Sequence, residues 1–206
     1  MSQVMTPQDA ERQRAAKIAE ARSRLTVDDY NRVSFGNNVW KESNMRQWLN
    51  SSGNDWFQKQ NEYDIKSKNP EYGSGWMTDF VPGFLELVMP VYNKTARNTV
   101  SAIDGGGGGG YDITLDRFWL LSITEFDGTI FNGIAEGKQL SYFSEVATTN
   151  EQRIQYGEDG VAVGSRLRSS VFSLVNSAFL ILTNGTAYYN DGQVSNRFAF
   201  QPVMCL

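Results

Sequence analysis

The stretch Ser165–Leu206, "SRLRSSVFSLVNSAFLILTNGTAYYNDGQVSNRFAFQPVMCL", contains short strand-like runs separated by Asn, Gly and Asp turns. The dipeptide Asn184–Gly185 is typical of a two-residue β-hairpin turn, and "YNDGQV" predicts a second turn of the same kind. Runs rich in Val, Ile, Phe and Tyr between such turns indicate short strands. We therefore predict that a three-stranded antiparallel meander closes the chain.

The residues upstream of this meander mix short helices with strands. Helical periodicity predicts helices over Lys41–Leu49, over "GFLELV" at 83–88 and over "EGKQLSYFSEV" at 136–146. A strand is expected in "VMPVYNKTA" at 88–96. In "DITLDRFWLLSITEF" at 112–126, apolar residues alternate at Ile113 and Leu115 before a solid apolar run, so a buried strand followed by an acidic helix start is expected. This mixture predicts an α+β fold.

Tryptophans are distributed along the whole chain within apolar patterns. We interpret four of them as core residues, namely Trp40, Trp48, Trp76 and Trp119, and the role of Trp56 is left open.

The first 34 residues differ in composition from the rest. Thr6 is a plausible N-cap and Pro7 suits the first helical position, so a helix is predicted from Thr6 to Leu25. Its apolar stripe is thin, which leaves two readings: a solvated arm, or a helix that docks on a partner or on copies of itself. We therefore divide the chain into an N-terminal helical arm, 1–34, and a domain, 35–206.

Composition excludes several classes of function. The 206 residues carry a net charge of −4, no histidine and one cysteine, Cys205. Ser-His and Cys-His nucleophile pairs, the usual zinc sites and a disulfide within the chain are thus excluded. No basic stripe, membrane-length apolar run or signal peptide is present, so we expect no nucleic-acid or membrane partner and synthesis in a bacterial cytoplasm.

Six consecutive glycines, Gly105–Gly110, precede the strand expected at Tyr111. A phosphate-binding loop needs a Lys and a Ser or Thr directly after the glycines, at the start of a helix. Neither follows here, so we interpret this run as a flexible surface connection rather than a nucleotide site.

The closing meander is the best place to seek a ligand. Tyr, Ser and Asn together are the composition of adaptable binding surfaces, because rigid rings give contact area and small polar groups give hydrogen bonds. Ordinary solvated strand faces are the alternative. The candidate ligand-binding residues are Phe172, Ser173, Asn176, Ser177, Tyr188, Tyr189, Asn190 and Asn196.

The charged residues favour structural roles. Arg166 and Arg168 lie two apart on a predicted strand, so both face one side; we favour bonds to carbonyls and carboxylates over an anion or carbohydrate contact. Asp112 with Asp116, or Glu158 with Asp159, could coordinate calcium, but no EF-hand loop is present. No carboxylate pair is singled out for glycoside hydrolysis. We therefore assign no catalytic residue, metal or cofactor.

Three stretches together resemble one known family. They are "NNVWKESNMRQWLNSSG" at 37–53, "PVYNKTARNTV" with "GGGYDITLDRFWLLSITE" at 90–125, and the closing segment from Arg166. Their shared residues resemble the DUF6273 domain over about 35–206: Trp40, Ser43, Arg46, Trp48, Leu49 and Asn50; Asp116, Phe118, Trp119, Leu120, Leu121 and Ser122; Arg166, Leu167, Arg168 and Ser169.

The chain departs from the family pattern at two places. Val163, Gly164 and Ser165 replace an aromatic pair, which removes support for a stacking role there, and Gln201 stands where the family has an arginine.

The resemblance implies a C-type-lectin-like domain that displays a binding face. We accordingly expect a phage virion protein — a capsid decoration, head fibre or tail adhesin — that recognises a host-surface glycan or protein. Its arm would bind other virion proteins or sibling subunits, giving a homo-oligomer. A bacterial interaction module outside any virion is the alternative, and a carboxylate-dependent glycan-active enzyme is a weaker one.

Overall fold

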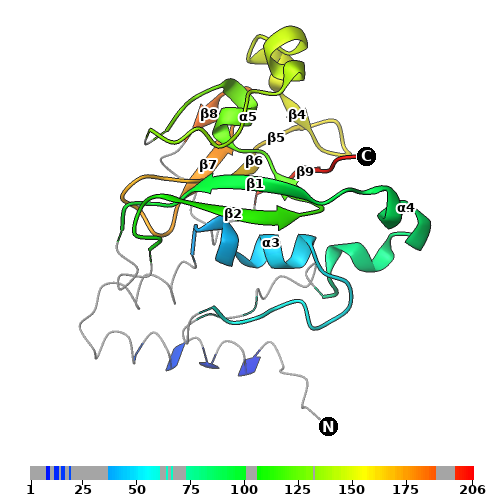
Figure 1. Ribbon diagram of the computed structural model, residues 1–206, viewed down its shortest axis with the longest axis vertical. Coiled ribbons are helices and arrows are strands. Elements are labelled where there is room, and N and C mark those ends of the chain that lie inside the picture. Colours follow the sequence, from blue (N-terminus) through cyan, green and yellow to red (C-terminus); the bar gives the residue numbers. More distant parts are fainter. Residues whose placement is uncertain are drawn as a thin grey trace.

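The computed structural model gives the arrangement of most of the chain (Figure 1). The residues that it describes are 8–9, 12–13, 15–16, 19, 37–60, 64, 66, 73–100, 106–131, 133–188 and 198–206. Within the arm, the described positions between 8 and 19 are helical and exposed, as predicted for a helix from Thr6 to Leu25. The remainder of that predicted helix lies outside the described residues.

Short helices and the tryptophans form a first core. Elements η1 (Trp40–Glu42) and α3 (Asn44–Leu49) replace the single helix predicted over Lys41–Leu49. The break falls at Ser43, whose side chain accepts a hydrogen bond from the Arg46 N–H and so caps α3. Elements η3 (Trp76–Asp79) and α4 (Pro82–Leu87) complete this layer, the latter as predicted.

The four tryptophans predicted to be core residues all lie in this cluster. Trp40, Trp48 and Trp119 are buried, and the partly buried Trp76 packs against them, with its ring 5.1 Å from that of Trp48. Trp56, whose role the sequence left open, is also buried.

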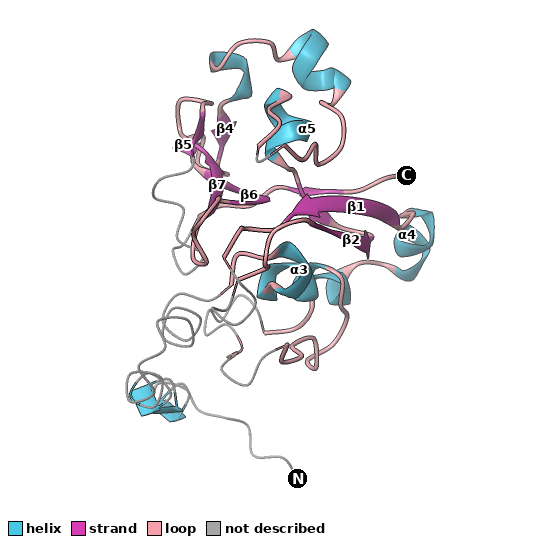
Figure 2. Ribbon diagram, turned by 60° about the vertical axis from the view of Figure 1, so that its left-hand side comes forward, coloured by secondary structure: helices cyan, strands magenta, loops and turns pink. Residues whose placement is uncertain are grey.

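An antiparallel ribbon crosses the molecule. Strand β1 (Val91–Ala96) pairs with β2 (Tyr111–Asp116) over six residues without a register shift. In both views α3 lies below this ribbon and α5 (Ile123–Asp127) lies above it (Figures 1 and 2). A capping box between Ser122 and Glu125 starts α5 where the sequence predicted an acidic helix start.

The ribbon corrects one sequence-based expectation. Ile113 and Leu115 were expected in a buried strand, yet they are 51% and 49% exposed. The polar residues that alternate with them, Asp112 and Thr114, are the buried ones. Alternation predicts that one face is buried but does not say which, and here the inward carboxylates find cationic partners.

The last third forms a second core around a three-stranded sheet in the order β6–β7–β8. Its strands are β6 (Ser165–Ser170), β7 (Ala178–Ile181) and β8 (Ala187–Tyr188), so the predicted meander is present. Before it come η4 (Tyr142–Val146), in one of the predicted helices, then η5 (Glu151–Arg153), β4 (Gln155–Tyr156) and β5 (Ala162–Val163).

Two details of the meander differ from prediction. The hairpin loop has three residues, 183–185, because Leu182 bonds Thr186 and, within it, only Gly185 takes a positive φ of 78°. The last stretch does not continue the meander: β9 (Pro202–Val203) pairs with β3 (Trp119–Leu120). Pro202 lacks an N–H, which suits such a short edge pairing. The second predicted turn, "YNDGQV" at 189–194, lies outside the described residues.

These elements confirm the α+β class, with short helices and small antiparallel sheets. Among the helices that the structure describes, none combines the length and apolarity needed to span a membrane.

Candidate functional site

The loop between β6 and β7 presents two large apolar side chains to solvent. Phe172 is 45% exposed and Leu174 is 41% exposed, whereas Val171 and Val175 on either side are buried. Between the exposed pair, Ser173 has a φ of 59° and is the one non-glycine residue with positive φ among those described. This conformation costs about 1–3 kcal/mol and persists only where surrounding contacts impose it. We call Phe172, Ser173 and Leu174 the loop tip.

Two buried asparagines hold the loop from beneath. The Asn38 side-chain amide donates to the carbonyls of Leu174 at 2.8 Å and Ser177 at 2.6 Å, and its main-chain N–H donates to Val175 at 3.1 Å. Asn98 in turn donates to the Asn38 side-chain oxygen at 2.7 Å. The loop carbonyls are therefore satisfied by the protein itself, and the tip is fixed before any ligand arrives.

The glycine segment packs beside the same asparagines. The Asn98 side-chain oxygen accepts from the Gly107 N–H at 2.9 Å, and the Gly108 N–H donates to Val100 at 2.6 Å. A Cβ added at Gly106 would lie 2.5 Å from the Val100 carbonyl oxygen, so no larger residue fits there. Gly106–Gly110 therefore form a surface connection, as interpreted from the sequence, and hydrogen bonds to neighbouring residues hold it in place. These glycines lead into β2 and not into a helix, as predicted.

Thr99, which precedes that segment, reaches the loop tip. Its hydroxyl lies 3.2 Å from that of Ser173, and the two share a hydrogen bond. The tip, Thr99 and the glycine segment therefore form one continuous surface.

The predicted ligand-binding residues divide between this surface and other places. Phe172 and Ser173 are at the tip, Asn176 is half-buried, and Ser177 is 3% exposed with its hydroxyl turned to Asn176. Tyr188 is half-buried on β8, where it pairs with Leu180. Tyr189, Asn190 and Asn196 lie outside the described residues. Sequence reasoning missed Leu174, although it is an apolar residue in a Ser- and Asn-rich stretch, and it had no signal for Asn38, Asn98 or Thr99.

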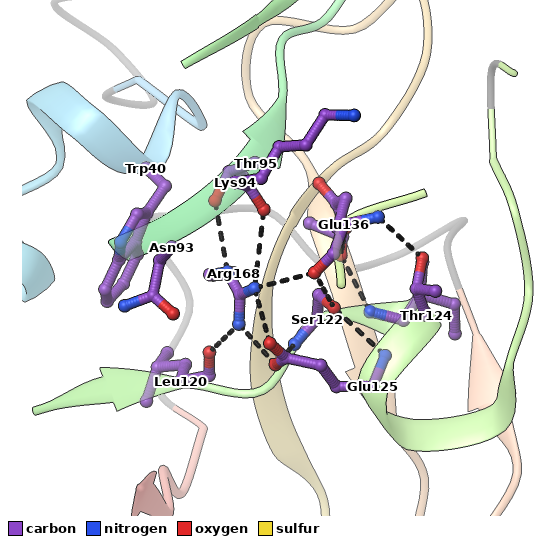
Figure 3. Close-up of polar contacts among 12 residues, drawn as sticks. Trp40, Asn93, Lys94, Thr95, Leu120, Ser122, Thr124, Glu125, Glu136 and Arg168 are labelled. Carbon is purple, nitrogen blue, oxygen red and sulfur yellow. Dashed lines mark hydrogen bonds and ion pairs between the residues drawn. The ribbon is translucent and has the colours of Figure 1, made fainter. Parts of the chain in front are cut away.

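Arg168 is the centre of a buried polar network (Figure 3). It is 1% exposed, and its guanidinium donates to the Leu120 carbonyl at 2.7 Å and to the Glu136 carbonyl at 3.0 Å. It also forms a two-pronged ion pair with Glu125. The predicted structural role of Arg168 is confirmed. Arg166 lies with its guanidinium 5.4 Å from the centre of the Phe198 ring.

Glu136 is the most deeply buried carboxylate of this network. Burial raises its pKa, against the opposing effects of the Ser169 hydroxyl, the Arg168 charge and the Ala96 N–H. The Ala96 N–H donates to it at 2.7 Å, and Ser169 donates to its other oxygen. A raised pKa is also typical of catalytic acids, but at 2% exposure this carboxyl is sealed from any substrate.

The two aspartates considered for calcium are engaged by protein donors. Asp116 accepts from Arg46 at 2.7 Å and from the Trp40 indole at 3.1 Å. Asp112 forms a two-pronged pair with Arg97. Burial acts to raise the pKa of Asp112, but Arg97 together with Lys41 outweighs it and holds that pKa below its ordinary value.

The other calcium alternative, Glu158 and Asp159, is on the exposed β4–β5 turn, where Asp159 accepts from the Val161 N–H. Across the described ranges, no three His, Cys, Asp or Glu side chains gather as a metal site would need.

The fold and this surface define an α+β protein with a fixed, partly apolar loop supported by buried polar residues. The sequence profile of DUF6273, a domain of unknown function, matches residues 15–206, and the chain belongs to that family. The match begins within the arm, 20 residues before the start of the resemblance at about residue 35. No curated protein and no solved structure matches the chain.

Proposed function

We propose that this chain is a recognition module, without catalytic activity, that presents the loop tip to a partner outside itself. The observation that carries the proposal is the tip: Phe172 and Leu174 are exposed around Ser173, which is held at positive φ. A fixed loop loses little conformational entropy on binding, so its exposed apolar area contributes efficiently to affinity. The engaged carboxylates support a role in binding rather than in a reaction.

We further propose that the fold is C-type-lectin-like and that the module is displayed on a phage virion, where it recognises a host-surface glycan or protein. Short helices, small antiparallel sheets and long irregular connections support this version of an α+β fold. A bacterial module outside any virion would use the same tip.

Binding to whole bacterial cells and to an array of bacterial surface glycans tests the recognition proposal. We expect Phe172→Ala and Leu174→Ala each to weaken binding by about tenfold or more, because each removes an exposed anchor from the tip. Tyr142→Ala is the matched control, since Tyr142 is 54% exposed on η4. Equal binding by all four proteins, or no binding by the wild type, would refute the proposal.

Mass spectrometry of purified phage particles tests the virion assignment separately. We expect peptides of this chain in the particles. Their absence, with the protein present in the cell lysate, would favour the bacterial module.

A further inference from the structure

The outer face of the β1–β2 ribbon is apolar. Tyr92 is 75% exposed and Tyr111 is 52% exposed, and with Ile113 and Leu115 they surround a single lysine, Lys94. The Lys94 ammonium lies 4.5 Å from the centre of the Tyr111 ring. A contiguous exposed apolar face of this kind marks an interaction surface.

The outer edge of β2 offers main-chain hydrogen bonds. In an antiparallel pair, residues alternate between those that bond the partner strand and those whose N–H and C=O point away from it. Arg97 bonds Gly110, and Ala96 bonds the Glu136 side chain rather than its strand partner Tyr111. Tyr111, Ile113 and Leu115 therefore direct their main-chain groups away from β1.

No third strand pairs with that edge in the described part of the chain. The sheet has the two strands β1 and β2, and the main chain of Tyr111, Ile113 and Leu115 bonds no segment there beyond this pair. Natural edge strands are often protected by lysine, proline, a bulge or inward-pointing charges. Strand β2 has no lysine, proline or bulge over its six residues, and its two inward-pointing carboxylates, Asp112 and Asp116, are each paired with an arginine of the same chain.

We propose that β2 is a self-association edge, which pairs antiparallel with β2 of a second copy about a two-fold axis at Ile113. This register places Tyr111 opposite Leu115 of the second copy and makes a continuous four-stranded sheet. Each of the pairs 111–115, 113–113 and 115–111 would exchange two N–H···O=C bonds. Such self-complementarity is what an isologous dimer requires.

The charges of the two copies are compatible with this pairing. On the inner face of β2, Asp112 and Asp116 are each neutralised by an arginine of their own copy, at 2.5 Å and 2.7 Å. On the outer face, the exposed residues of β2 are uncharged, and Lys94 lies one strand away on β1. The pairing therefore brings no like charges opposite one another.

Sedimentation equilibrium of the full chain tests the dimer. Ile113→Pro removes the outward N–H at the axis but keeps the β1–β2 ladder, so we expect the dimer dissociation constant to rise about 100-fold or more. Ile113→Val keeps the amide and is the matched control, expected to remain dimeric. A monomeric wild type, or a dimer that Ile113→Pro leaves unchanged, would overturn the proposal.

A cross-linking experiment tests the dimer independently, in case Ile113→Pro does not fold. In a Cys205→Ser background, Ile113→Cys should form a disulfide-linked dimer on oxidation, because paired residues at the axis have Cα atoms about 5.5 Å apart. Tyr92→Cys, on the same face but on β1, should not. Equal cross-linking of the two variants would rule out this register.

Discussion

Buried charges decide how distant segments meet in this molecule. Asp116 joins Trp40 and Arg46 of the first helices to the β1–β2 ribbon, and Arg168 joins β6 to β3 and to α5. A buried charge that loses its partner destabilises a protein by about 3–5 kcal/mol. Each of these residues therefore selects one packing of its neighbours.

Glu136 makes the stability of the fold depend on pH. Because burial raises its pKa in the folded chain, the folded state binds this proton more tightly than the unfolded state does. The stabilisation is therefore complete below the ordinary pKa of a glutamate and is lost as pH rises through the raised value. Glu136→Gln should remove this decline, whose slope cannot exceed about 1.4 kcal/mol per pH unit for one proton.

Urea unfolding at a series of values from about pH 4 to about pH 8 measures this effect. Glu145→Gln removes an exposed carboxylate and should follow the wild-type curve. Asp112, whose pKa is lowered, contributes with the opposite sign and at lower pH. Parallel curves for Glu136→Gln and the wild type would contradict the assignment.

At the scale of elements, hydrogen bonds to Asn98 and Val100 hold the glycine segment, Gly106–Gly110, in one conformation. In Gly106→Ala the new Cβ would meet the Val100 carbonyl oxygen at 2.5 Å and the Asn98 side-chain oxygen at 2.7 Å. We expect a loss of about 1–3 kcal/mol in the free energy of unfolding, since the backbone must shift. Gly83→Ala is the control, because nothing lies within 4 Å of its Cβ, and alanine favours the helix α4. Equal stability of the two variants would show instead that Gly106 lies in a flexible connection.

Sequence patterns predicted where helices and strands lie better than which face of each is buried or which strand it pairs with. The apolar pattern predicted Trp48 as a core residue within a helix, and it is buried on α3. The alternation in β2 predicted a strand but suggested the wrong buried face, because the partners of Asp112 and Asp116 come from segments 15 and 70 residues away. Strand propensity also could not assign β9 to β3, since that pairing depends on the assembled core.

The candidate site shows the same limit at the scale of the whole molecule. Composition singled out Phe172 and Ser173, which do lie at the tip. The tip is held by a hydrogen bond from Asn38 to Leu174, 136 residues away in sequence, and Asn38 is held by Asn98, 60 residues away. No local sequence pattern encodes contacts over such separations. A β2-mediated dimer would carry two such tips and would raise affinity for a multivalent surface without any new contact.

The N-terminal arm, residues 1–34, has a proposed role separate from that of the folded domain. Its described positions are helical and exposed, which supports an arm that contributes little to the core. We expect deletion of residues 1–30 to leave a folded protein whose Tm changes by less than about 3 °C. The β2 dimer should persist, whereas incorporation into particles, measured by mass spectrometry of purified virions, should be lost. A fall in Tm of about 10 °C or more would show instead that the arm belongs to the core, in keeping with a family match that begins at residue 15.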